Sequence, residues 1–181
     1  MDMLQLRDAF PSYAKDVWIT LDGALNKSGL ASEVAAGAAI AAAISAGSPE
    51  LVEAFQGLTS ETEATGAKTA AAIMGMTNIW YSYLHLADDA ELKTQPPQIR
   101  MQGYATHGGV EKKHFEIYAL AASIVGKCQG CVTGHIAELK KLGITAAELR
   151  DIGRLAAAVN ATSKILTLKK KQPEVETAAI G

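Results

Sequence analysis

Helical periodicity runs through almost the whole chain and limits its possible folds more than any other feature of the sequence. Apolar residues recur at steps of three and four, whereas no segment offers several alternating β-branched residues bounded by turns. The sequence therefore predicts an all-α, compact helical subunit. The expected helices are about 12–26, 32–46, 49–56, 60–86, 88–93, 97–104, 111–125, 128–142 and 145–168.

Several of these helix boundaries have a chemical cause. Ser48 can cap a helix whose first residue is Pro49. The capping-box spacing of a hydroxyl residue and a glutamate occurs at 60–63 and again at 145–148. The uncharged run 34–49 is rich in alanine and glycine and falls short of the roughly 20 strongly apolar residues of a membrane span. We expect it to form a buried helix that packs closely against its neighbours.

Cysteine occurs only twice, in the motif Cys128-Gln129-Gly130-Cys131, so any thiol chemistry depends on this pair. Within the expected helix 128–142, Cys128, Cys131 and His135 fall on one apolar face. Lysines occupy the opposite face, and Gly143 follows where a helix end favours a left-handed residue. The helix therefore brings both sulfurs and the imidazole to the same side.

A Cys-x-x-Cys pair at a helix start brings two sulfurs within bonding range, and the unpaired backbone N–H groups there stabilise a thiolate. Cys128 is the nearer of the two to that helix start. His135 lies four residues after Cys131, so its imidazole can accept the thiol proton or stabilise the thiolate. We expect the Cys131 thiol to lose its proton more readily than a free cysteine, and a redox dithiol is the leading interpretation.

A carboxylate is expected behind the imidazole. Residues Gly126 and Lys127 separate the helices 111–125 and 128–142, which we expect to fold back as a hairpin. Glu116 lies ten residues before the Gly126 pivot and His135 nine after it, so the two should stand at the same height. Such a carboxylate would orient the imidazole and raise its basicity, giving the chain Glu116, His135, Cys131.

Less specific readings of the same residues also exist. Two thiolates, His135 and Glu116 could together ligate zinc, although structural zinc sites are typically richer in cysteine. A purely structural disulfide is disfavoured because its two-residue loop restrains little of the unfolded chain. A lone apolar-face histidine is more often a core residue, and a lone glutamate a solvated one. His85, His107 and His114 have no partner in the sequence and are assigned no role.

Length and charge restrict the class of protein. The chain has 181 residues and a formal net charge of -2, which suits one domain and leaves no basic stripe for nucleic acid or an anionic membrane. The start Met1-Asp2-Met3-Leu4-Gln5 lacks a basic segment and an apolar core, so no secretory signal is visible and a cytoplasmic location is expected.

The chain is expected to form a single domain over 1–168, followed by a disordered tail over 169–181. A faint internal repeat is also visible. In residues 39–53 an expected helix is followed by Gly47, a capping residue and then Glu50-Leu51. In residues 136–151 an expected helix is followed by Gly143, a capping residue and then Glu148-Leu149. This echo suggests a degenerate duplication, although the pattern of helix, glycine, cap and helix is common in itself.

The arrangement of Glu116, the cysteine motif 128–131 and His135 resembles the active-site pattern of the AhpD-like alkyl hydroperoxide reductases, within the carboxymuconolactone decarboxylase superfamily. The similarity covers most of the chain. It includes Pro11-Ser12-Tyr13-Ala14-Lys15-Asp16 near the start, Ala72-Ile73-Met74-Gly75-Met76 with Asn78, and the Phe115-Glu116 pair.

The resemblance implies an all-helical homotrimer whose dithiol reduces hydroperoxides or re-reduces a partner peroxiredoxin, with electrons arriving from a lipoyl group on a dehydrogenase-complex subunit. It also implies that Cys131 attacks, that Cys128 resolves, and that Glu116 with His135 forms the proton relay. The family pattern often has a histidine immediately before the second cysteine, where this chain has Gly130. Its absence removes one proton-transfer group and one positive charge.

Three functions from different classes follow from the sequence. The first is the antioxidant thiol–disulfide oxidoreductase just described, with no tightly bound cofactor or metal. The second is a non-redox enzyme similar to the carboxymuconolactone decarboxylases, in which the cysteines would be dispensable. The third is a non-catalytic helical oligomer whose dithiol senses oxidation or holds a metal.

Overall fold

The computed structural model describes the backbone of residues 1–171, and over that range the chain contains helices and connecting segments without a strand. This confirms the all-α prediction. In chain order the elements are α1 (Met3–Asp8), the 3-10 turn η1 (Ser12–Ala14), α2 (Lys15–Asn26), α3 (Ser32–Ser45), α4 (Pro49–Gln56), α5 (Glu61–Ala87), α6 (Ala90–Thr94), α7 (Gln102–Thr106), the 3-10 turn η2 (His107–Gly109), α8 (Lys112–Val125), α9 (Gln129–Lys141) and α10 (Ala146–Lys171).

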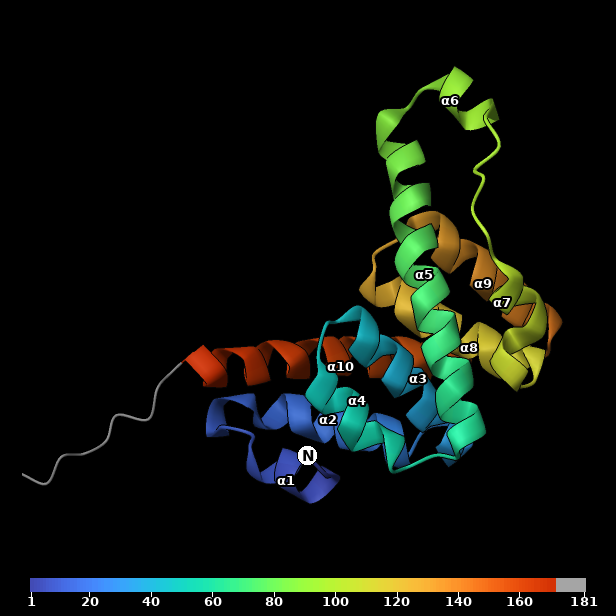
Figure 1. The fold of residues 1–181 in the computed structure, drawn as a ribbon. Coiled ribbons are helices and arrows are strands. Elements are labelled where there is room, and N and C mark those ends of the chain that lie inside the picture. Colours follow the sequence, from blue (N-terminus) through green and yellow to red (C-terminus); the bar gives the residue numbers. More distant parts are fainter. Residues whose placement is uncertain (172–181) are drawn as a thin grey trace, which may run out of the picture.

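The helices α3, α5 and α8 pack against one another, and α10 packs against α2, α3 and α8. The C-terminal half of α5 extends beyond the other helices, with α6 at its far end, and the chain then returns to α7, which packs against α5 (Figure 1). No helix within the described residues is long and apolar enough to cross a membrane.

The alanine-rich helix α3 lies at the centre of the core, as its composition predicts. Its residues from Val34 to Ala43 are all buried. Small side chains let neighbouring helices approach closely, and one such approach is at Gly37, where the Tyr118 ring of α8 lies. A Cβ atom added to Gly37 would come within 2.6 Å of the Tyr118 hydroxyl oxygen. Gly37 therefore sets the spacing between α3 and α8, and α8 carries Glu116.

We expect Gly37→Ala to lower the free energy of unfolding by about 1–3 kcal/mol, because the added methyl group forces the buried Tyr118 ring to move. Urea denaturation measures this change. Gly75→Ala is the matched control, since a Cβ atom at that exposed position in α5 meets no atom within 4 Å. Equal stabilities of the two variants would contradict the close contact.

The structure differs from the sequence-based expectations in three places. The helix α1 was not expected, although Asp2 and Gln5 form a complete capping box at its start. The helix expected over 97–104 is wrong: residues 96–101 are not helical, Gln98 has φ +49, and only the short α7 follows. The last helix continues through 169–171, and the rest of the expected tail, 172–181, lies outside the described residues.

One type of turn recurs between helices of the chain. The turn between α3 and α4, through Gly47 and Ser48, has the same backbone hydrogen-bond pattern as the turn between α8 and α9, through Lys127 and Cys128. The turn between α9 and α10, through Gly143 and Ile144, has this pattern as well, so the expected match of residues 39–53 with 136–151 stays a prediction. When the turns before α4 and α9 are aligned, Ser48 occupies the position of Cys128.

Candidate active site

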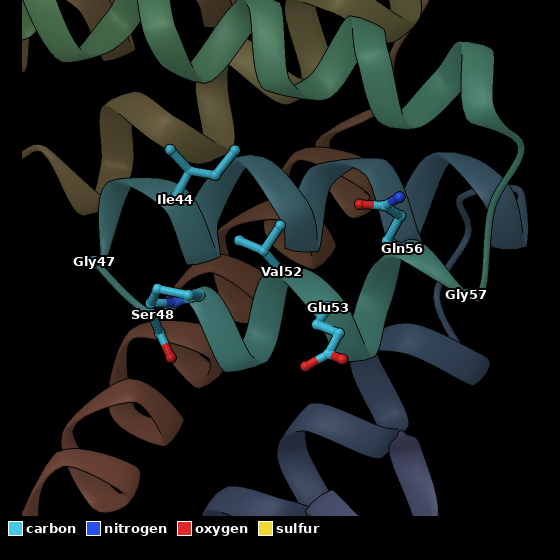
Figure 2. A pocket seen from close by; sticks show the side chains of 8 residues that line it. Ile44, Gly47, Ser48, Val52, Glu53, Gln56 and Gly57 are labelled. Atoms are coloured by element: carbon cyan, nitrogen blue, oxygen red, sulfur yellow. The ribbon is translucent and has the colours of Figure 1, made fainter. Parts of the chain in front are cut away.

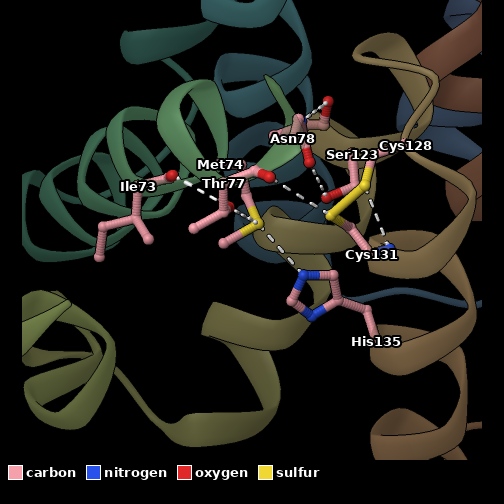
Figure 3. The surroundings of a disulfide bond; sticks show 9 residues. Ile73, Met74, Thr77, Asn78, Ser123, Cys128, Cys131 and His135 are labelled. Atoms are coloured by element: carbon pink, nitrogen blue, oxygen red, sulfur yellow. Dashed lines mark hydrogen bonds between the residues drawn. A yellow bond between two sulfur atoms is a disulfide. The ribbon is translucent and has the colours of Figure 1, made fainter. Parts of the chain in front are cut away.

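The two cysteines lie at the start of α9 and form a disulfide, with their Cα atoms 5.3 Å apart (Figure 3). Cys128 is the N-cap residue, and its Sγ accepts a hydrogen bond from the backbone N–H of Cys131 at 3.2 Å. Cys128 is only 1% exposed, whereas Cys131 is partly exposed. Any reagent entering from solvent therefore has better access to the sulfur of Cys131.

The helix α5 supports the turn that holds the disulfide. The Asn78 side chain accepts a hydrogen bond from the Ser123 hydroxyl at 3.0 Å and donates one to the Ala122 carbonyl at 3.4 Å (Figure 3). Within this turn Lys127 has φ +56, which is the left-handed conformation. In the turn between α3 and α4, Gly47 holds the same position. These contacts fix where α9 begins relative to α5.

The structure brings Glu116 and His135 into contact across the hairpin. His135 Nδ1 lies 2.7 Å from Glu116 Oε2, and the side chains are 9% and 0% exposed. The equal heights expected from the hairpin count explain this contact, because the tight turn places α8 and α9 side by side. A buried carboxylate has no solvent to stabilise its charge, so the imidazole N–H supplies part of that stabilisation.

The other imidazole nitrogen does not contact a cysteine. His135 Nε2 lies 3.2 Å from the thioether sulfur of Met74 in α5, so the expected direct contact between His135 and Cys131 is replaced in the disulfide form (Figure 3). A carboxylate and a thioether are both hydrogen-bond acceptors. Each ring nitrogen of His135 therefore faces a group that can accept a hydrogen bond.

Tyr104 in α7 is a site residue that the sequence did not reveal. Its hydroxyl donates a hydrogen bond to Glu116 Oε1, the carboxylate oxygen not used by His135. Burial, together with the neighbouring carboxylate, raises the pKa of Tyr104 well above its usual range. Burial also tends to raise the pKa of Glu116, but the hydrogen bonds from His135 and Tyr104 outweigh it and the net pKa is lowered.

These residues lie at a pocket of about 920 Å³ whose lining includes both cysteines and His135. The protruding half of α5 supplies one wall through Tyr81, His85 and Leu86. Met101 and Tyr104, just before and within α7, supply another. Several of these side chains are large and apolar, so the pocket can admit an organic molecule to the sulfur of Cys131.

A second hollow, of about 670 Å³, lies at the corresponding turn of the first hairpin (Figure 2). Its lining contains Ser48 at the position of Cys128, together with Val52 and Glu53, but neither cysteine nor histidine. The two hairpins thus share a backbone arrangement, and sulfur chemistry is confined to the second.

Two of the remaining histidines have contacts that account for their positions. His114 Nδ1 lies 2.9 Å from Glu63 Oε1, and Tyr118 donates its hydroxyl hydrogen to the other oxygen of Glu63. The ring of His107 packs against Tyr104 and Phe115. At the start of α5, the Ser60 side chain accepts the expected hydrogen bond from the Glu63 backbone N–H. The Glu63 carboxylate does not complete the capping box, because it faces His114 and Tyr118 of α8.

Comparison with known proteins gives the family. Three proteins named alkyl hydroperoxide reductase AhpD align with nearly the whole chain. The one from Maricaulis maris (strain MCS10) is 35% identical over 92% of this chain and 98% of its own length. Those from Frankia alni (strain ACN14a) and Bradyrhizobium sp. (strain BTAi1) are 37% and 34% identical, each over 90% of this chain and 90% and 92% of their own lengths. The chain belongs to the AhpD family.

A model of the carboxymuconolactone decarboxylase family matches residues 90–170, which include the complete hairpin α8–α9. The AhpD-like interpretation of the sequence is therefore confirmed at the level of family. Gly130, where the AhpD-like pattern often has a histidine, lies at the pocket, and a Cβ atom added there meets no atom within 4 Å. A side chain would fit at this position, so the glycine is not required by packing.

The zinc alternative would need the cysteines, His135 and Glu116 to surround one point. Within the part of the chain that the structure describes, no group of three or more histidine, cysteine, aspartate or glutamate side chains is arranged to hold a metal ion. Glu116 instead directs one oxygen at His135 and the other at Tyr104.

Proposed function

We propose that this AhpD family protein is an antioxidant thiol–disulfide oxidoreductase that reduces organic hydroperoxides, re-reduces a partner peroxiredoxin, or does both. The Cys128–Cys131 dithiol is recharged by a dihydrolipoyl group carried on another protein. The observation that carries this proposal is the disulfide at a helix start, with Cys131 partly exposed beside a pocket and a buried Glu116–His135 pair behind it.

The oxidative half of the cycle begins when the Cys131 thiolate attacks the terminal oxygen of the hydroperoxide. The S–O bond forms as the O–O bond breaks, and the departing alkoxide takes a proton to become an alcohol. The Cys128 thiolate then attacks the sulfenic sulfur, which closes the disulfide and releases water once the departing hydroxide is protonated. Exposure favours Cys131 for the first step, because Cys128 is buried.

In the reductive half, a dihydrolipoyl thiolate attacks the Cys131 sulfur and Cys128 departs as a thiolate. The N-cap hydrogen bond from the Cys131 backbone N–H stabilises that departing anion. The second lipoyl thiolate then displaces Cys131, and the donor leaves as a cyclic disulfide that has given up two electrons. When a peroxiredoxin is served, its disulfide takes the place of the peroxide as electron acceptor.

The role of Glu116 and His135 in this proposal is to hold and move a proton. The imidazole donates a proton to the cysteine sulfur that leaves when the disulfide is reduced. It accepts the proton again when the thiolate must form. Met74 occupies the Nε2 side of the imidazole in the disulfide form, so it must yield this place to a cysteine sulfur during the cycle. The flexible side chain of methionine suits this exchange.

The homotrimer implied by the resemblance is also part of the proposal. The protruding half of α5 exposes large apolar side chains, among them Ile79 at 70% and Leu86 at 81%. Such a patch is typical of a surface that another subunit covers. Light scattering measures the molar mass of the assembly; a monomer at micromolar concentration would overturn this part of the proposal.

The activity is tested with dihydrolipoamide as donor and tert-butyl hydroperoxide as acceptor, and in parallel with an oxidised peroxiredoxin as acceptor. We expect donor oxidation to require the protein and at least one acceptor. Protein pre-treated with reductant and iodoacetamide is the control, because alkylation removes both thiols without changing the chain. If the untreated protein is no faster than the alkylated one with either acceptor, the redox proposal fails, and a screen of lactone substrates tests the decarboxylase-like alternative.

A further inference from the structure

We propose that Tyr104 is a positioning residue of the dithiol site, which holds the Glu116 carboxylate ionised and oriented toward His135. The inference rests on the proposed redox function and adds a residue to it. Three observations carry it: the Tyr104 hydroxyl bonds to Glu116, the Tyr104 ring is held in place by its neighbours, and position 130 has no side chain.

The first observation is that both oxygens of the Glu116 carboxylate, which is 0% exposed, have a hydrogen-bond partner. His135 occupies Oε2 and Tyr104 occupies Oε1, so each oxygen receives a hydrogen from one partner. A buried carboxylate with only one donor would more readily take up a proton itself. It would then no longer attract the proton of His135. The Tyr104 hydroxyl therefore helps to keep the negative charge on Glu116, where it faces the imidazole of His135.

The second observation is that the Tyr104 hydroxyl is held in position. Its ring meets Phe115 edge to face with centroids 5.4 Å apart, and Phe115 directly precedes Glu116 in the chain. The adjacent Gly103 lies against α5, where an added Cβ atom would come 3.0 Å from the Ile73 and Thr69 side chains. Packing on α5 and α8 thus fixes the phenol relative to the carboxylate, as a positioning role requires.

The third observation is the composition of the site. The AhpD-like pattern often has a histidine before the second cysteine, and this chain has Gly130 there. Gly130 and Tyr104 line the same pocket. With no imidazole at position 130, the Glu116–His135 pair is the proton-transfer group that the site retains, and Tyr104 is the side chain that sets its charge state.

The test follows the reactivity of the reduced thiols as a function of pH, measured from the rate of alkylation by iodoacetamide. Tyr104→Phe keeps the ring and removes the hydroxyl, so the carboxylate loses a donor and the Glu116–His135 pair binds its proton more tightly. We expect the pH at which the thiols become reactive to rise by about one unit. An alkylation curve that coincides with that of the unchanged protein overturns the inference.

Tyr118→Phe is the matched control. Tyr118 also donates to a glutamate that pairs with a histidine, namely Glu63 with His114, and none of these three residues lines the pocket that contains the cysteines. We expect its alkylation curve to coincide with that of the unchanged protein. A shift equal to that of Tyr104→Phe would show that any lost tyrosine–glutamate bond has this effect, and would overturn the specific role of Tyr104.

A second measurement keeps the inference testable if Tyr104→Phe does not fold. The ultraviolet absorbance of phenolate reports the titration of the five tyrosines. In Glu116→Gln the carboxylate that raises the pKa of Tyr104 is gone, so one tyrosine should ionise at a lower pH. An unchanged titration overturns the contact. Neither assay uses peroxide or lipoyl donor, so a protein without turnover but with the expected shifts would refute the redox function and leave the role of Tyr104 intact.

Discussion

Cys131→Ser should reduce hydroperoxide turnover by at least about 1,000-fold, to the background of the uncatalysed reaction. The hydroxyl of serine is a far weaker nucleophile than a thiolate, and the remaining sulfur of Cys128 is 1% exposed at the N-cap of α9. A peroxide that enters the pocket therefore meets only the poorly exposed thiol of Cys128. The measurement is the steady-state oxidation of dihydrolipoamide with peroxide present, at protein concentrations verified by circular dichroism.

Cys128→Ser separates the two proposed roles. Its Cys131 thiolate should still react once with peroxide, giving one equivalent of sulfenic acid that a dimedone probe traps, and turnover should then stop for lack of a resolving thiol. Ser48→Ala is the control at the corresponding turn of the first hairpin, and we expect full activity from it. Two results together would reject Cys131 as the attacking residue: continued turnover by Cys131→Ser, and no sulfenic acid trapped in Cys128→Ser.

The contact between Glu116 and His135 could be predicted because it depends only on local geometry. A helix has a fixed rise per residue, and the short break at residues 126–128 leaves little freedom in how α8 and α9 are aligned. Counting from the turn is then enough to pair residues across the hairpin. The same reasoning places Cys128 at the helix start, since the chain must end one helix before it begins the next.

Met74 and Tyr104 could not be found in this way, because they reach the site from other elements. Met74 lies in α5, and its height against α9 depends on how closely α3, α5 and α8 pack, which is set by contacts such as that of Gly37 with Tyr118. Tyr104 was assigned to a helix over 97–104 that does not exist, so its direction could not be inferred. The positive φ of Gln98 belongs to a loop whose path only the folded protein determines.

The expected internal repeat stays a prediction for a related reason. A helix, a glycine, a cap and a second helix describe both the turn before α4 and the turn before α10, so the pattern alone cannot choose between alignments. Gly143 and Lys127 both hold the place of Gly47 in such a turn, and Lys127 adopts the left-handed conformation without being glycine. A search for glycine at the turn therefore misses the turn that holds the cysteines.

Glu116→Gln should slow disulfide formation by about 100-fold or more near neutral pH, because a positioned acid–base group contributes on that scale. Glutamine has nearly the shape of glutamate but no charge, so the buried His135 loses the carboxylate that holds its proton. Stopped-flow measurement of disulfide formation after peroxide addition gives the rate, and its pH dependence should change as well as its magnitude.

The stability of the same variant tests the charge state of Glu116. Because its folded-state pKa is lowered, the stabilisation by the carboxylate is fully present above the unfolded-state pKa and is lost as the pH falls through the folded-state pKa. The unchanged protein should therefore lose its stability advantage over Glu116→Gln as the solution is acidified. Urea denaturation at several acidic pH values measures the difference; an advantage that stays constant would mean that Glu116 is not ionised in the folded protein.

Glu63→Gln provides the control for both measurements, since Glu63 also joins α8 through a histidine and a tyrosine. Its loss should weaken the packing of α5 against α8 and leave the rate of disulfide formation unchanged. If Glu63→Gln slowed that rate as much as Glu116→Gln, the effect would belong to the support of α8 as a whole. A slow rate confined to Glu116→Gln would instead tie it to the carboxylate that faces His135, because both variants remove a glutamate–histidine contact that involves α8.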